Sequence, residues 1–164
     1  MAMTGYVLTV ERLVPAPPEA VFDVLADVSR HHLIDGSGML QGANQGAPQR
    51  LALGTSFGMG MKLFMSYSTV NRVVEFEESR RIAWKTGPTG FMGRIVAGRV
   101  WRYELAPADG GTLVRESWDI TDDHQRFLLK LGGIYWGKTR RDMERTLDRL
   151  SRLVAGDDAQ GSAT

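Results

Sequence analysis

Glu116 is the residue of this 164-residue chain whose surroundings most suggest chemistry. It lies in a segment of β-strand character, where alternation places Trp118 and other apolar side chains on the same face. If that face points inward, the carboxyl group loses hydration, its pKa rises, and it can act as an acid or a base. Two alternatives stay open: an ion pair with an inward Arg12 or Arg102, and a bulged strand that leaves Glu116 in water.

Aromatic and thioether side chains form a second group of candidates, because they can stack on or adapt to a flat apolar ligand. A tyrosine hydroxyl could also polarise a carbonyl. Packing in the core is an equal alternative for the methionines, and we expect only two or three of the aromatic residues to touch a ligand. The candidate ligand contacts are Met59, Met61, Tyr67, Trp84, Trp101, Tyr103, Trp118, Trp136 and His32.

A metal or cofactor site is not predicted. Adjacent His31 and His32 on a helix point in different directions. Asp35 is the one carboxylate that follows them closely, which gives too few ligands for a metal site. The chain has no cysteine, which excludes thiolate catalysis and Cys-ligated metals. The glycines of residues 36–42 miss the dinucleotide-binding fingerprint by one residue. We therefore expect a histidine pair at the surface or at a pocket mouth.

Composition and charge limit the partners. Lys plus Arg is 20 against 19 acidic residues, and 43% of the chain is hydrophobic, which suits one globular domain and argues against nucleic-acid binding. Arginines recur along the C-terminal segment, but acidic residues alternate with them, so an ion-paired solvated face is predicted. No apolar run approaches the roughly 20 residues that span a bilayer, and no secretory signal is visible. We expect a cytoplasmic protein without stable membrane insertion; a homodimer stays open.

The hydrophobic pattern changes period along the chain and so separates strands from helices. Residues 7–14 predict a first strand, which Pro15-Ala16-Pro17-Pro18 ends, since proline lacks an amide donor and its fixed φ favours a helix start. Helical spacing predicts short helices over 19–28 and 29–35. A glycine-rich connection with at most one brief strand follows over 36–54.

Period-two alternation and short turns predict an antiparallel meander in the next part of the chain. Its turn signals are Gly87-Pro88-Thr89-Gly90 and Asp109-Gly110-Gly111. The expected strands cover residues 55–63, 67–76, 81–86, 94–106 and 112–120.

A long amphipathic helix is predicted to close the chain. It begins at 121–123, with Asp122 and Gln125 as a loose capping box, and Gly132-Gly133 interrupts it early. Its expected apolar stripe consists of Trp136, Met143, Leu147, Leu150 and Val154. Residues 156–164 are small and polar and predict a flexible tail.

This order of elements, together with three local motifs, resembles the START-like, or helix-grip, superfamily that includes the birch-pollen-allergen-like proteins. The motifs are VERLVPAPPEAVFDVLAD at 10–27, VVEF at 73–76 leading to RIAW at 81–84, and GGTLV at 110–114. The bacterial polyketide cyclase/dehydrase and lipid-transport family is the most similar. Where that family often has a tryptophan after the first helix, this chain has His31-His32.

The resemblance implies an α+β helix-grip fold, in which a curved antiparallel sheet wraps around a long C-terminal helix, with two short helices after the first strand. It further implies one START-like ligand-binding domain over 1–155 and a cavity between the sheet and the long helix. Members bind lipids, sterols, polyketides or plant hormones, and some cyclise or dehydrate a polyketide.

Three hypotheses for function follow. The leading one is binding or carriage of a small hydrophobic ligand that is lipid-like, polyketide or aromatic. The second is an enzyme of the cyclase/dehydratase kind, acting on a polyketide-like substrate through the carboxyl group of Glu116. The third is a protein-interaction domain without a ligand, which would expose an apolar patch instead.

Overall fold

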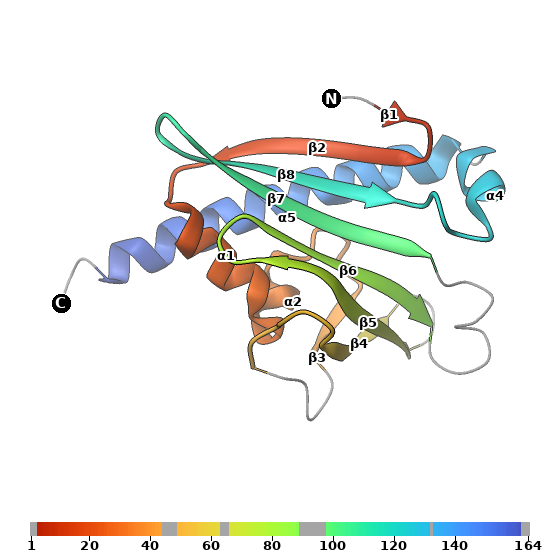
Figure 1. Cartoon of the computed structure of the whole chain (residues 1–164), viewed down its shortest axis with the longest axis horizontal. Helices are drawn as coiled ribbons and strands as arrows, with labels where there is room; N and C mark the ends of the chain where they lie inside the picture. Colours follow the sequence, from red (N-terminus) through yellow and green to blue (C-terminus); the bar gives the residue numbers. More distant parts are fainter. Residues whose placement is uncertain (1–2, 44–48, 63–65, 89–97, 132, 162–164) are drawn as a thin grey trace.

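One curled antiparallel sheet dominates the computed structural model, which describes residues 3–43, 49–62, 66–88, 98–131 and 133–161. Its eight strands follow the spatial order β1-β2-β8-β7-β6-β5-β4-β3 (Figure 1). The strands are β1 Met3–Thr4, β2 Val7–Val14, β3 Leu40–Ala43, β4 Ser56–Lys62, β5 Ser66–Glu77, β6 Arg81–Pro88, β7 Arg99–Ala108 and β8 Gly111–Asp119.

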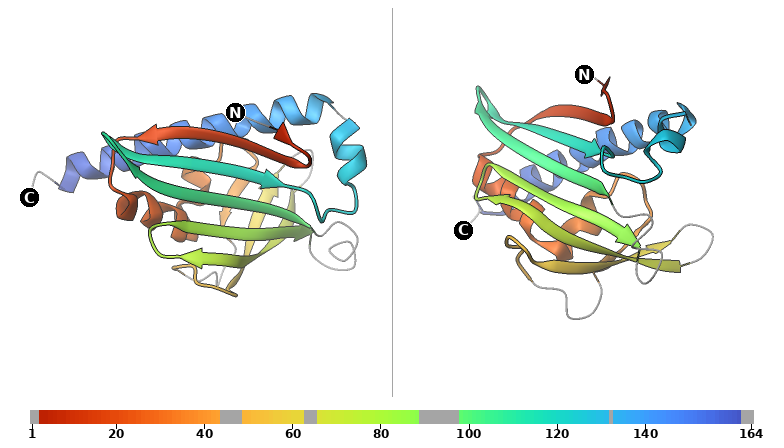
Figure 2. Two further views of the ribbon diagram at one scale, coloured as in Figure 1. Left: turned by 45° about the horizontal axis from the view of Figure 1, so that its top comes forward. Right: turned by 45° about the vertical axis from the view of Figure 1, so that its right-hand side comes forward.

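The helices lie on one side of this sheet. They are α1 Pro18–Ala26, the 3-10 helix η1 Val28–Arg30, α2 His31–Ile34, α4 Arg126–Leu131 and α5 Gly133–Gly161. Helix α5 crosses the sheet and contacts β2, β8, α1 and α2 (Figure 2). None of the helices described is long and apolar enough to cross a membrane. The predicted α+β helix-grip fold is confirmed.

Local chemistry explains where the main helices form and which face they bury. Proline at the start of α1 needs no amide partner, and Pro17 before it has an extended backbone, so the helix begins where the fixed φ angles favour it. The predicted apolar stripe of α5 is confirmed, because Met143, Leu147, Leu150 and Val154 are each at most 1% exposed.

The predicted end of the third meander strand is wrong. Gly87 and Pro88, expected in a turn, instead extend β6 and pair with Val70 and Thr69 of β5. Pairing with a neighbouring strand of 12 residues outweighs the local turn signal there. The remaining part of that turn, and residues 94–97 of the next expected strand, lie outside the described residues.

The start of the C-terminal helices also differs from the prediction. Asp123, not Asp122, accepts the local hydrogen bond, from the Gln125 amide at 2.7 Å. Its other carboxylate oxygen pairs with Arg99 at 2.7 Å, and the first helix here begins at Arg126. Helix α4 ends at Leu131 and α5 begins at Gly133, and Figure 2 shows the two helices running in different directions; residue 132 of the predicted interruption lies outside the described residues. Helix α5 continues to Gly161, through most of the segment predicted as a tail; the domain boundary at 155 stays a prediction.

A glycine allows the segment after α2 to lie directly against α5. A Cβ atom on Gly36 would lie 2.0 Å from the Asp142 carbonyl oxygen and 2.7 Å from the Thr146 amide nitrogen. The Gly36 amide donates to Thr146 Oγ1 at 3.0 Å, and the Arg149 guanidinium donates to the Asp35 carbonyl. These contacts hold the α2–β3 connection at a fixed distance from α5.

Replacing Gly36 by alanine should therefore destabilise the protein by about 1–3 kcal/mol, because the new methyl group overlaps backbone atoms that cannot move independently. Gly137→Ala is the matched control: it lies within α5, a Cβ there meets nothing within 4 Å, and helix propensity favours alanine by about 1 kcal/mol. Urea unfolding measures both. Equal stability of the two variants would contradict the close approach.

Candidate ligand-binding cavity

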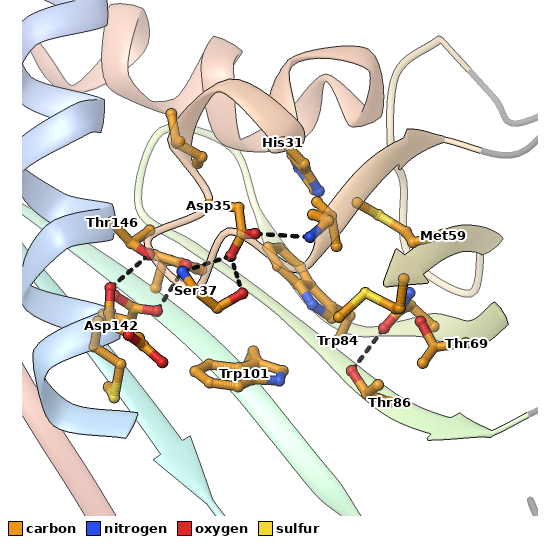
Figure 3. A pocket seen from close by; sticks show the side chains of 17 residues that line it. His31, Asp35, Ser37, Met59, Thr69, Trp84, Thr86, Trp101, Asp142 and Thr146 are labelled. Carbon is orange, nitrogen blue, oxygen red and sulfur yellow. Dashed lines mark hydrogen bonds between the residues drawn. The ribbon is translucent and has the colours of Figure 1, made fainter. Parts of the chain in front are cut away.

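A cavity of about 180 Å³ lies between the sheet, the α2–β3 connection and α5 (Figure 3). Its apolar wall consists of Ile34, Leu40, Met59, Met61, Trp84, Trp101 and Met143. Its polar wall consists of His31, Asp35, Ser37, Thr69, Asn71, Thr86, Tyr103, Glu116, Asp142 and Thr146. Figure 3 shows Asp35, Ser37, Asp142 and Thr146 on one side of the two tryptophan rings, and Thr69 and Thr86 on the other.

Glu116 is buried in this wall, with only 2% of the residue exposed. It lies opposite Tyr103 in the β7–β8 register, and the Tyr103 hydroxyl donates to Oε1 at 2.9 Å. Oε2 has no hydrogen-bond partner among the residues that the structure describes. Burial raises the pKa of Glu116 to about 8; the Tyr103 hydrogen bond opposes that rise, and the charge of Asp35 adds to it. Burial and the nearby Glu116 likewise raise the pKa of Tyr103.

The two alternatives for Glu116 are wrong. Arg12 pairs with Asp148 at 2.8 Å, and Arg102 pairs with Glu75 at 2.6 Å, so neither guanidinium neutralises Glu116. Strand β8 pairs with β2 and β7 without a shift in register, so no bulge turns the carboxyl group toward water.

An aromatic wall surrounds the carboxyl group. The Trp84 ring stacks on His31, with the centroids 5.1 Å apart, and lies 5.5 Å from the Tyr103 ring. Trp101 lines the cavity from β7, and Met59 and Met61 line it from β4. These predicted residues therefore share one cavity with Glu116, and their contact with a ligand stays a prediction.

Other predicted contacts lie elsewhere. Trp118 and Trp136 are buried and do not line the cavity: Trp118 stacks on Trp101 with the centroids 5.9 Å apart, and Trp136 meets Trp118 edge-on. His32 is exposed and does not line the cavity, so its predicted place there is wrong. The side chain of Tyr67 lies outside the described part of the chain.

His31 occupies the place predicted for His32. Its Nε2 lies 2.8 Å from the Leu25 carbonyl oxygen, and burial lowers its pKa, so the neutral ring donates this hydrogen bond. The two histidines diverge as adjacent residues on a helix must. The described residues include no group of at least three His, Asp or Glu side chains arranged to hold a metal ion.

Sequence reasoning missed several polar lining residues. Asn71 is 4% exposed, and its Oδ1 accepts from Thr86 Oγ1 at 2.6 Å. Asp35 Oδ1 accepts from the Ser37 amide at 3.0 Å and from its hydroxyl at 2.7 Å. Alternation along β5 places Thr69 and Asn71 on the inward face with Val73, so that signal was available; the sequence suggested Asp35 only as a metal ligand.

The comparisons with solved structures agree with this architecture. Protein NE0264 from Nitrosomonas europaea has a TM-score of 0.67 at 17% identity, over 94% of this chain and 97% of that one. The Polyketide_cyc-like protein Cgl2372 from Corynebacterium glutamicum has a TM-score of 0.58 at 20% identity, over 94% of both chains. At these identities the similarity establishes the fold alone.

Sequence comparisons define the family. The uncharacterized protein Rv0088 from Mycobacterium tuberculosis is 34% identical over 150 residues, which cover 87% of this chain. The matched region spans 61% of that relative's length, about three fifths of it. The family described as "Polyketide cyclase / dehydrase and lipid transport" matches residues 7–155. A match over that much of the sequence means that the chain belongs to the polyketide cyclase/dehydrase and lipid transport family.

Proposed function

We propose that this protein binds a small hydrophobic ligand that carries a hydrogen-bond acceptor, in the cavity between the sheet and α5. The observation that carries the proposal is the buried carboxyl group of Glu116, one oxygen of which has no partner at the wall of a largely apolar cavity. Apolar sites with few polar groups are the usual form of small-molecule sites, in which the polar groups set the orientation.

The protonation state of Glu116 determines what it offers a ligand. A pKa of about 8 keeps the carboxyl group neutral near neutral pH. Because Oε1 accepts the Tyr103 hydroxyl, the acidic proton is placed on Oε2. A neutral carboxylic acid donates from that oxygen, and a ligand carbonyl, ether or hydroxyl oxygen can accept. Leaving a buried donor unpaired costs about 1–3 kcal/mol, which such a ligand recovers.

The size of the cavity indicates the size of the ligand. An apolar cavity of about 150 Å³ can hold a benzene molecule. The cavity here, about 180 Å³, therefore suits a single substituted ring or a short branched chain. The Trp84 and Trp101 rings in its wall favour a flat ligand, through stacking.

The same carboxyl group supports a second candidate function. A neutral acid beside a phenol can donate a proton to a ligand oxygen, which is the step a cyclase/dehydratase needs. Recovery of an unaltered ligand from the purified protein on denaturation would favour carriage. Turnover of a polyketide-like substrate that disappears in Glu116→Gln, while binding persists, would favour the enzyme.

The raised pKa of Glu116 predicts how stability depends on pH. Between the ordinary carboxyl value near 4.5 and about 8, the folded protein holds a proton that the unfolded chain has released, so stability falls as pH rises. The free energy of unfolding of the wild type, minus that of Glu116→Gln, should therefore decline by about 1.4 kcal/mol per pH unit across that window. Burial lowers the pKa of His31, which makes stability rise with pH in the acidic range, but His31 is present in both proteins and its effect cancels in the comparison.

Urea unfolding at several pH values measures this difference. Glu104→Gln is the control for losing a carboxylate. Glu104 does not line the cavity, and it forms an ion pair with Arg81 at an N–O distance of 3.2 Å. Parallel pH profiles for wild type and Glu116→Gln would contradict a neutral buried Glu116.

Filling the cavity should abolish binding. Thr69→Phe places a ring inside, whereas Val70→Phe, one residue along β5, places the same ring on the outer face, where Val70 is 43% exposed. We expect the first variant to weaken acetophenone binding by about tenfold or more, and the second to bind as wild type does.

Chemical-shift titration of the isotope-labelled protein measures the affinity and locates the ligand, and near-ultraviolet circular dichroism checks that both variants are folded. Equal affinity in the two variants, or shifts confined to residues outside the cavity wall, would contradict the proposed site.

A further inference from the structure

We propose that the cavity selects by charge: it accepts an uncharged or cationic ligand and rejects an anionic one of the same shape. This inference rests on the proposed function and narrows its ligand class. It excludes ligands whose carboxylate or phosphate group would have to enter the cavity, and it favours ketones, alcohols, ethers and amines.

The ionisable groups of the wall carry one sign. Asp35, Glu116 and Asp142 come from three separate elements, and within the described residues that line the cavity there is no lysine or arginine. His31 is not a cation in this setting, because burial lowers its pKa and its Nε2–H is committed to the Leu25 carbonyl oxygen. A ligand anion would therefore find no countercharge in this part of the wall.

Asp35 is the carboxylate that counts most. Its oxygens accept from the Ser37 amide and hydroxyl and, at 2.8 Å, from the Leu40 amide, all of which are neutral donors (Figure 3). The Arg149 guanidinium donates to the main-chain carbonyl of Asp35, but the described salt bridges include none to the Asp35 side chain. Asp142 differs, since Lys138 at 2.5 Å and Arg145 at 3.5 Å offset its charge.

The negative charge of Asp35 acts on Glu116 and Tyr103 in another part of the cavity wall. Its charge is among the causes that raise the pKa of both Glu116 and Tyr103. A negative ligand placed beside that pair would meet the same repulsion, in a site where solvent screens little. A buried anion without a partner is costly in itself.

Glu116 adds a buried polar group to the two aspartates of the cavity wall. It is 2% exposed, it lines the cavity, and its Oε2 has no partner, so it presents one polar group to a ligand from inside the wall. As a neutral donor it can pair with an uncharged acceptor. A ligand carboxylate could also accept this hydrogen bond, but only by placing its charge in the field of Asp35.

Three probes of nearly equal shape test the inference: acetophenone is neutral, benzoate is an anion and benzamidine is a cation near neutral pH. We expect acetophenone and benzamidinium to bind in the cavity of the full chain, and benzoate to bind at least about tenfold more weakly than acetophenone. Chemical-shift titration measures all three affinities and identifies where each probe binds.

Asp35→Asn removes the charge of the side chain and keeps one of its two acceptor oxygens, so it can still accept from Ser37 but loses the hydrogen bond from the Leu40 amide. It should narrow the ratio of acetophenone to benzoate affinity by about fivefold or more, because the repulsion of benzoate is lost. Asp23→Asn is the control: that side chain is 63% exposed on α1 and pairs with Arg50, so the ratio should keep its wild-type value.

The outcomes separate the two claims. Benzoate binding in the cavity as tightly as acetophenone would overturn the charge selection and leave the proposed function intact. An unchanged ratio in Asp35→Asn would overturn the part assigned to Asp35. Binding of no probe to the wild-type cavity would overturn the proposed function, and the charge selection with it.

Discussion

Burial of one carboxyl group is the constraint on which the candidate site depends. Glu116 lies in the inward row of β8, where dehydration disfavours its charge; in the described part of the chain, the Tyr103 hydroxyl alone compensates for the lost water. The continuous register of β8 with β2 and β7 fixes that position, since a slip by one residue would turn the carboxyl group to the outer face. The strand pairing thus determines both the fold and the chemistry available in the cavity.

The frame that holds this site combines dense packing with an incomplete interior. The apolar stripe of α5 and the contact of Gly36 with Thr146 hold two walls at a fixed distance, while the space between them is not filled by side chains. A neutral acid with an unpartnered oxygen lowers stability, and an apolar residue there would pack without that cost. The ligand that we propose, which accepts from Oε2, would offset this cost.

Much of the fold could be predicted from local patterns, because strand alternation, proline at the start of α1 and the α5 stripe are local properties. The same alternation placed Glu116 in an apolar row, but it left open whether that row faces inward, which the structure shows. It could not separate cavity from core: Trp101 lines the cavity, whereas Trp118, opposite it in the β7–β8 register, packs against the Trp101 ring and does not line the cavity. The sequence could not show which of His31 and His32 faces the cavity, because the rotation of a one-turn helix depends on tertiary contacts. Here the hydrogen bond to the Leu25 carbonyl turns His31 inward. Asp35 was weighed only as a metal ligand, because its place in the cavity wall depends on the distant contact between Gly36 and α5.

The most direct test is to observe the Glu116 carboxyl carbon by nuclear magnetic resonance during a pH titration, with and without acetophenone. We expect a midpoint near 8 for the free protein and a higher midpoint with acetophenone bound, since the ligand oxygen pairs with the protonated form. A midpoint near the ordinary value of 4.5, or one that does not move on binding, would contradict it.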